Sequence, residues 1–218
     1  MEGANHRAES VEDVYKAKMD IKFTKEGKGR IEFTIKGIDY TKANAIRRAV
    51  MSYVPAMAVK TITLYENSSI LYEEMIAQRI GLIPLSTDLK TYQIKDDKYK
   101  PGDARYECSL LLEKEGPGTV YSGDIKSSDP KIKPIYDNIP IVKLREGQKL
   151  KMEMTAGLGF ITEHAKYQCA ICSYGQKADD EFEFFVESFN NMSAREVLDK
   201  ALLALEEKTK ILEGSLTK

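Results

Sequence analysis

The sequence predicts an α+β fold, with mixed sheet and helix at both ends of the chain and a mostly β middle section. Three observations support this class. Apolar and polar residues alternate at residues 21–35 and 181–188, which is typical of strands with one buried face. A segment with helical periodicity follows each of them, at residues 44–55 and 194–213. Between about residues 55 and 151, short alternating runs are separated by turns rich in glycine and proline.

The first predicted element is a β-hairpin. Ile21 and Phe23 alternate with polar residues, the sequence EGKG turns the chain, and Ile31, Phe33 and Ile35 alternate again. Because alternate residues of a strand point to the same side, these apolar side chains share one face. The hairpin is therefore expected to lie with that face on a hydrophobic core.

A helix is predicted next, around the sequence NAIRRAVMSYVP at residues 44–55. Asp39 or Thr41 can cap its start, and Pro55 forces it to stop. At 100° per residue, one side of this helix is apolar and suits packing on a core. That apolar side consists of Ile46, Ala49, Val50 and Tyr53.

The opposite side of the same helix carries Asn44, Arg48 and Met51, and Arg47 lies on the flank. Two interpretations are open at this point. The two arginines can form an ordinary solvated outer face, or they can bind another molecule. The helix by itself does not decide between them.

The middle section begins with a strand, VKTITLY, and a helix within NSSILYEEMIAQRIGLIPL. Asn67, Ser68 or Ser69 can cap this helix at its start. Gly81 is placed where a left-handed residue commonly ends a helix, and a proline follows. Further strands are expected at residues 106–112, in TVYSGDI, in IPIVKL, and at residues 150–154.

The last third returns to sheet and helix. AKYQCAICSYG and EFEFFVES are predicted as strands joined by the polar sequence QKADD. Ser193 and Glu196 then form a capping box that opens a helix running to about residue 213.

The apolar stripe of this last helix is wider than its own sheet requires. Leu198, Leu202, Leu205 and Leu212 form a nearly heptad seam, which Val197, Ala201, Ala204 and Ile211 widen. The stripe spans roughly 160°, whereas about 100° is enough to cover one sheet. The surplus predicts a second apolar neighbour, such as another chain. A wide core within a lone monomer is the alternative.

The only metal-like spacing in the chain is Cys169-Ala-Ile-Cys172, with His164 upstream. A structural zinc site needs four ligands, and only Cys108 remains among the cysteines. Residues three apart in a strand point to opposite faces, so we expect these cysteines to be ordinary core residues. The sequence contains no catalytic constellation: the paired acidic residues lack a partner, and no phosphate-binding glycine loop is present.

Composition narrows the class further. The chain has 218 residues and a net charge of −1, so no overall charge draws it to nucleic acid or to an anionic membrane. No apolar run approaches the roughly 20 residues of a transmembrane helix, and the polar N-terminus lacks the apolar core of a secretion signal. We expect a cytoplasmic protein with reduced cysteines. Residues 1–14 are expected to form a flexible polar arm at its N-terminus.

Two long stretches resemble one known family. They are NAIRRAVMSYVPAMAVKTITLYENSSILYEEMIAQRIGLIPL and GPGTVYSGDIKSSDPKIKPIYDNIPIVKLREGQKLKMEMTAGLGFITEHAKYQ. Both are similar to the α-like assembly subunits of cellular RNA polymerases, in the archaeal form that is called D. The resemblance covers roughly residues 15–215, and its motifs occur in the same order as in the family.

The resemblance implies a discontinuous dimerisation domain, residues 15–54 and 152–218, interrupted by a mostly β insert domain, residues 55–151. It implies a non-catalytic subunit of the archaeal DNA-directed RNA polymerase, a nucleotidyltransferase. Such a chain pairs with the smaller subunit L. The pair then binds the second-largest subunit, which is called B, and the small subunits N and P. DNA would be contacted only through the whole enzyme.

Functional residues follow from the same resemblance. The family's Asn-Ala-φ-Arg-Arg helix meets the large catalytic chain, which assigns Asn44, Arg47, Arg48 and Met51 to a large-subunit interface. The last helix belongs to the pairing surface, through Leu198, Ala201, Leu202, Leu205 and Leu212. Arg48 is the strongest candidate for the large-subunit contact, because it points furthest from the core of its own chain.

Some features depart from the family. Neither the cysteine-bearing domain that many archaeal relatives insert after the HAKW-type motif nor the zinc loop of eukaryotic relatives has a counterpart here. Gln78 replaces a usual histidine, and Tyr167 replaces a usual tryptophan. No cofactor is therefore expected. Two rival hypotheses are a metal or thiol enzyme that uses His164, Cys169 and Cys172, and a homodimeric α subunit of the bacterial type.

Overall fold

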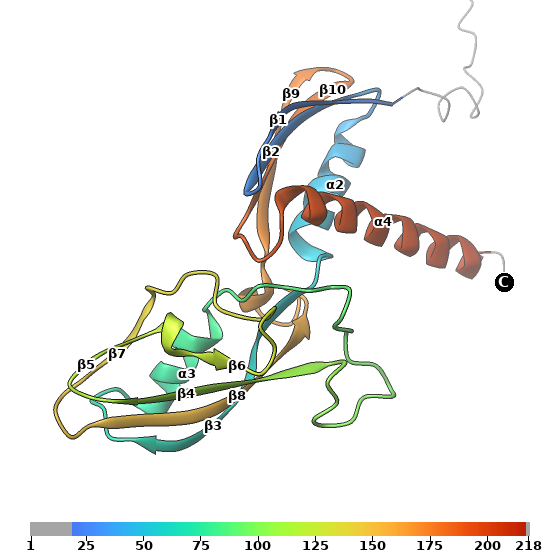
Figure 1. Cartoon of the computed structure of the whole chain (residues 1–218). Coiled ribbons are helices and arrows are strands. Elements are labelled where there is room, and N and C mark those ends of the chain that lie inside the picture. Colours follow the sequence, from blue (N-terminus) through green and yellow to red (C-terminus); the bar gives the residue numbers. More distant parts are fainter. Residues whose placement is uncertain (1–18, 217–218) are drawn as a thin grey trace, which may run out of the picture.

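The computed structural model describes residues 19–216 and has an α+β fold with antiparallel sheets, as the sequence predicted (Figure 1). The predicted flexible arm, residues 1–14, lies outside the described residues. The strands are β1 (Asp20–Glu26), β2 (Arg30–Lys36), β3 (Ala56–Asn67), β4 (Glu107–Glu115), β5 (Gly118–Tyr121), β6 (Lys126–Ser127), β7 (Pro140–Leu144), β8 (Lys149–Gly159), β9 (Ala170–Ala178) and β10 (Glu181–Ser188). The helices are α2 (Tyr40–Ser52), α3 (Glu73–Gly81) and α4 (Ala194–Leu216), with short 3-10 turns η1 (Ser122–Asp124) and η2 (Ala165–Tyr167). Within residues 19–216, no helix combines the length and the apolar character that crossing a bilayer demands.

The first sheet joins the two ends of the chain, in the order β1-β2-β10-β9. The predicted hairpin is confirmed as β1 and β2, and Phe23 pairs with Phe33. The Phe33 ring stacks on Phe184 of β10, with ring centroids 5.2 Å apart. The helices α2 and α4 contact this sheet and each other, so they cover its apolar side (Figure 1).

Helix α2 begins as the sequence predicted. Asp39 is the N-cap, and its Oδ1 accepts a hydrogen bond from the Lys42 backbone N–H at 2.8 Å. The helix ends at Ser52, because Pro55 follows and β3 begins at once. Its fully buried side chains are Ala43, Ala49 and Val50.

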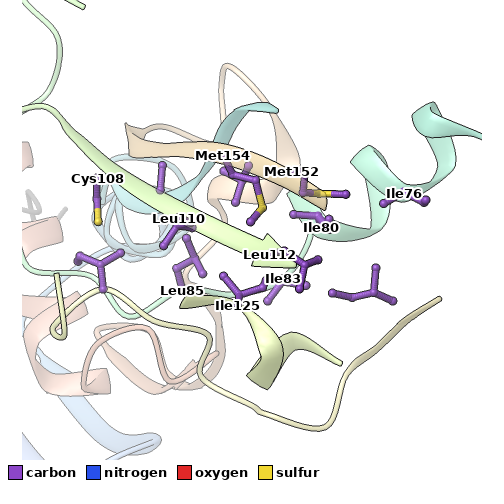
Figure 2. Packing of buried hydrophobic residues seen from close by; sticks show 14 of the residues in the cluster. Ile76, Ile80, Ile83, Leu85, Cys108, Leu110, Leu112, Ile125, Met152 and Met154 are labelled. Atoms are coloured by element: carbon purple, nitrogen blue, oxygen red, sulfur yellow. The ribbon is translucent and has the colours of Figure 1, made fainter. Parts of the chain in front are cut away.

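The second sheet has the order β3-β8-β4-β6, with the two-stranded ribbon β5-β7 beside it. Helix α3 packs against β3 and contributes Ile76 and Ile80 to a separate hydrophobic cluster. Figure 2 shows this cluster, including Met152 and Met154 from β8. The chain therefore has two cores, one for each sheet.

Two predicted ends of α3 are wrong. None of Asn67, Ser68 and Ser69 caps the helix; the N-cap is Tyr72, which makes no side-chain capping bond. Strand β3 continues to Asn67, and this side chain instead holds the turn that follows, donating from Nδ2 to the Leu71 carbonyl oxygen at 2.9 Å. At the other end Gly81 is the last helical residue, and the C-cap, Leu82, keeps an ordinary right-handed conformation.

Strand β8 bears on the predicted domain boundary. It pairs with β3 on one side and β4 on the other along most of its length, and its inward side chains join the second core. A boundary between residues 151 and 152 falls inside this strand. We propose that the insert includes all of β8 and that the chain returns to the first sheet only after Gly159.

We expect Gly159→Ala to lower the stability of the fold. A Cβ atom at Gly159 would lie 2.5–2.8 Å from ring atoms of Tyr167, which is buried and cannot move aside freely. Such overpacking costs about 1–3 kcal/mol, to be measured as a lower midpoint in urea unfolding. Gly175→Ala in β9 is the matched control, because nothing lies within 4 Å of its added methyl group. Equal losses in both variants would contradict this account.

Candidate subunit-interaction surfaces

The side chains of Asn44, Arg47 and Met51 form one row along α2. Arg47 donates from Nε and Nη2 to Asn44 Oδ1 at 3.2 and 2.9 Å, and its Nη1 lies 3.5 Å from the Met51 sulfur. All three are half-buried. The guanidinium of Arg47 therefore makes its hydrogen bonds within its own helix, on the flank that the sequence predicted.

Arg48 is placed differently. Its side chain is exposed, and it makes no hydrogen bond or ion pair with any residue in the described part of the chain. The exposed neighbours one and two turns before it on the same face, Ala45 and Thr41, are small. A single free guanidinium thus projects from the outer face of α2, where it can bind a carboxylate or a carbonyl group with its planar fork.

The expected orientation of Met51 is wrong. Met51 is half-buried and packs against the first core, rather than pointing away beside Arg48. The reason is that β9 lies along the flank of α2, so a residue on that flank still meets the sheet. Among the four predicted interface residues, only Arg48 is exposed, and the other three are half-buried.

The apolar stripe of helix α4 has a buried half and an exposed half. Ser193 opens the helix as predicted, its Oγ accepting a hydrogen bond from the Glu196 backbone N–H. Leu198 and Ala201 are buried in the first core and are unavailable to another molecule in this conformation. Leu205 is half-buried against the same core, while Leu202 and Leu212 are exposed.

The exposed half exists because α4 extends beyond the sheet that it covers. Its 23 residues make a helix of about 35 Å, and its C-terminal part extends past the sheet (Figure 1). Leu205, Leu212 and Leu216 lie on the same line along the helix as Leu198. Beyond Leu205, this core-facing stripe has no core beneath it. The exposed fraction of Leu212 is 60%. Leu216 is a further residue of this surface that the sequence analysis missed, because the helix was expected to end three residues earlier.

A groove of about 560 Å³ runs along the other side of α4. Tyr53 of α2, Leu203 and Ile211 of α4, and Ile94 and Phe160 from the chain around the second sheet line it. The Lys208 ammonium lies 4.4 Å from the centre of the Tyr53 ring, which ties α4 to the end of α2. This groove is separate from the exposed half of the apolar stripe, because Leu203 lies on the side of α4 opposite Leu212.

Cys169 and Cys172 are core residues, as predicted, but the reason given for that prediction is wrong. Cys169 and Cys172 were expected on opposite faces of a strand, but both are buried in the first core. Strand β9 starts at Ala170, so Cys169 lies before the strand, and its side chain does not follow the alternation between the two faces of the sheet. Burial raises the pKa of both thiols to about 12. Over residues 19–216, no three His, Cys, Asp or Glu side chains come close enough together to hold a metal ion.

We expect Cys169 and Cys172 to resist alkylation in the folded protein. Their pKa is raised above the ordinary value of 9.0, so at pH 8 the reactive thiolate is scarce and the sulfur is covered. Iodoacetamide followed by mass spectrometry should modify both residues in urea and neither in buffer. The raised pKa also means that their stabilising effect is complete below pH 9 and is lost as the pH rises toward 12. Rapid labelling of the folded protein at pH 8 would contradict this environment.

A second apolar surface lies on α3. Tyr72, which is the N-cap, Met75 within the helix and Leu82, which is the C-cap, are all exposed. The sequence analysis assigned no role to these residues. Their spacing of three and seven was the available signal, since it places them on one face of a helix.

Comparison with known proteins identifies the family of the chain. Residues 59–172 match the family described as the RNA polymerase Rpb3/RpoA insert domain. A Methanocaldococcus jannaschii protein named DNA-directed RNA polymerase subunit Rpo3 is 43% identical over 166 residues, which is 76% of this chain and 80% of that protein. Proteins of the same name from Pyrococcus furiosus and Methanosarcina acetivorans are 42% and 45% identical over 72% and 66% of this chain. The matched part spans only 59% and 55% of the length of those two relatives. The chain belongs to the Rpo3 family of DNA-directed RNA polymerase subunits, the archaeal D type among the α-like subunits.

Proposed function

We propose that this chain is an assembly subunit of a DNA-directed RNA polymerase that acts in the cytoplasm. It pairs with the smaller α-like subunit L and then docks the second-largest polymerase subunit. The complete enzyme makes RNA from nucleoside triphosphates, and this chain holds catalytic subunits in place without contributing a catalytic residue. DNA is contacted only through the complete enzyme.

The exposed half of the apolar stripe of α4, which extends past the first sheet and is called the overhanging half below, is the observation that carries this proposal. Leu212 and Leu216 continue the core-facing stripe beyond Leu205, where the described chain supplies no core. Burying a leucine side chain contributes about 1.5–3 kcal/mol, so covering this half gives a partner a large part of its binding energy. A second helix of similar apolar pattern, such as that of the L subunit, fits along it.

The outer face of α2 supplies a separate contact with the second-largest subunit. Arg48 projects alone from that face, whereas Arg47 is folded back onto Asn44. Arginine is enriched in protein interfaces, and its fork binds carboxylates and carbonyl oxygens specifically. The small subunits N and P are also proposed to bind this pair, as the family resemblance implies.

Stepwise reconstitution tests the proposal. The chain is mixed with recombinant L, then with the second-largest subunit, and the mass of each product is measured by native mass spectrometry. We expect a one-to-one pair with L, followed by a ternary complex that contains all three chains. A stable homodimer of this chain, or a pair that fails to recruit the second-largest subunit, would overturn the proposal.

A further inference from the structure

Lys60 is the extra residue of a β-bulge in β3. The residues before and after it, Val59 and Thr61, pair with two consecutive residues of β8, so no residue of β8 lies opposite Lys60. A bulge interrupts the alternation of a strand and redirects the side chain of its extra residue. The bulge, rather than the regular pleat of β3, therefore decides where the Lys60 side chain lies.

The aliphatic stem of Lys60 lies over Gly157 of β8. A Cβ atom at Gly157 would be 3.3 Å from both Cδ and Cε of the lysine, closer than an ordinary van der Waals contact. Lys60 is half-buried there, and its Nζ is 5.7 Å from the centre of the Tyr167 ring. Burial raises the pKa of Tyr167 to about 12, so its hydroxyl stays neutral and adds no counter-charge. The stem of Lys60 is thus packed on the sheet, and its ammonium is near an uncharged ring.

A second ammonium lies next to the peptide group of Lys60. Lys166 of η2 donates from Nζ to the Val59 carbonyl oxygen at 2.7 Å, and that carbonyl belongs to the peptide bond between Val59 and Lys60. Lys166 Nζ is also 5.3 Å from the centre of the Tyr167 ring. The bond to Val59 uses one of the three N–H groups of this ammonium, which leaves the others to bind an anion.

Lys60 differs from the ordinary surface lysines of this chain. Its ammonium makes no hydrogen bond or ion pair with any residue in the range 19–216. Lys36, by contrast, lies 3.0 Å from a carboxylate oxygen of Glu181. Lys149 lies 3.0 Å from one of Glu115. These hydrogen-bonded ion pairs raise the pKa of both exposed lysines.

The charges that act on Lys60 come from η2, from β4 and from the segment before β4. Burial lowers the pKa of Lys60, and the like charges of Lys95 and Lys166 lower it further. Glu163 and Glu107 oppose this effect, but Glu107 is held by Lys95 at 2.8 Å. The pKa of Lys60 is lowered in sum, so its neutral, nucleophilic amine is more abundant than that of an ordinary lysine.

We propose that Lys60 is a site of covalent modification by acyl phosphates. The lone pair of the neutral Nζ attacks the acyl carbon, and a C–N bond forms. The C–O bond between the acyl carbon and the phosphate breaks. The phosphate leaves with that electron pair and takes up the proton that Nζ loses. The remaining N–H groups of Lys166 hold the phosphate of the donor, an attraction that a neutral acyl donor lacks.

The product of this reaction fits a half-buried position. It is a neutral amide, which costs less to desolvate than an ammonium, so modification should leave the fold intact. The inference goes beyond the proposed function and does not rest on it, because every group that it uses belongs to this chain.

Acetyl phosphate tests this inference on the purified chain. At about pH 8, we expect Lys60 to be acetylated severalfold faster than Lys36 and Lys149, although these two are more exposed. The reason is that acetylation needs the neutral amine, whose share changes about tenfold for each pKa unit. The rate at each lysine is measured by mass spectrometry of peptides sampled over time. In urea the three rates should become equal, because unfolding removes the neighbours of Lys60.

Two charge variants should change the rate at Lys60 in opposite directions. Glu163→Gln removes the opposing carboxylate and should speed acetylation, while its amide oxygen can still accept from the Phe160 N–H, as Glu163 Oε1 does at 3.0 Å. Lys166→Gln removes a like charge and the group that holds the phosphate, so it should slow acetylation. With acetic anhydride, a neutral donor, Lys166→Gln should slow the reaction less than it does with acetyl phosphate.

Equal rates at Lys60, Lys36 and Lys149 in the folded chain would overturn the inference. A fast Lys60 whose rate changes in neither variant would overturn it too, since exposure alone would then explain the reaction. The urea midpoint of each variant shows whether it folds. If Lys166→Gln unfolds early, the comparison of the three lysines in wild type and the acceleration in Glu163→Gln still decide the outcome.

Discussion

We expect Leu212→Asp to abolish pairing with the L subunit while leaving the fold of this chain intact. Leu212 is 60% exposed and belongs to neither core, so a carboxylate there stays hydrated in the free chain. In the pair it would be buried without a counter-charge, which costs about 3–5 kcal/mol. The dissociation constant should rise about 10²- to 10⁴-fold.

Leu203→Asp is the matched control for this experiment. Leu203 is exposed on the same helix, but at 100° per residue it lies on the side opposite Leu212. Both variants should unfold like wild type, and only Leu212→Asp should elute from size exclusion apart from L. Leu205 is less suitable, because it is half-buried against its own core and an aspartate there would also disturb the fold. Coelution of Leu212→Asp with L would refute the role of the overhanging half.

We expect Arg48→Ala to prevent or sharply weaken the recruitment of the second-largest subunit. The side chain makes no hydrogen bond or ion pair within the described residues, so its loss should change the stability of this chain by less than about 0.5 kcal/mol. Pairing with L should also survive, because Arg48 is exposed and makes no hydrogen bond or ion pair with α4 within the described residues. Truncating an interfacial arginine with a buried partner costs about 2–5 kcal/mol, or roughly thirty-fold to several-thousand-fold in affinity.

Arg47→Ala provides the comparison for Arg48→Ala. Arg47 has the same chemistry one position earlier, but its guanidinium is bound to Asn44 Oδ1 and lies against Met51. Its loss should affect the binding of the second-largest subunit less and the local stability of α2 more. The measurement is the affinity of each variant pair for that subunit, obtained in a titration. If Arg48→Ala recruits it normally and fails instead to pair with L, the two faces of α2 have been assigned the wrong way round.

Local sequence patterns determined the elements of this fold. The alternation from Ile21 to Ile35 was enough to predict β1 and β2, because a strand places alternate residues on one face. Asp39 and Ser193 were enough to predict the starts of α2 and α4, because their side chains accept hydrogen bonds from the first turn of each helix. Each of these signals acts between residues close in sequence.

The same local reasoning failed where a residue outside the segment decides the outcome. Met51 was expected to face outward, but β9 lies beside that flank of α2 and half-buries it. Cys169 was expected to alternate with Cys172, but β9 begins one residue after Cys169. Spacing within a segment cannot show where a neighbouring strand begins or on which flank it lies.

The sequence by itself determined that α4 carries more apolar surface than one sheet requires, and it placed Arg48 on the side of its helix that faces away from the core. Only the tertiary structure decided which part of the surplus on α4 is exposed: Leu202 lies exposed beside the buried Ala201, and the C-terminal part of the helix extends past the sheet. Leu198 and Ala201 are buried and Leu212 is exposed because the sheet ends beneath the helix before the stripe does. Hydrophobic periodicity reports what one helix offers, whereas burial depends on where the rest of the chain stops covering it.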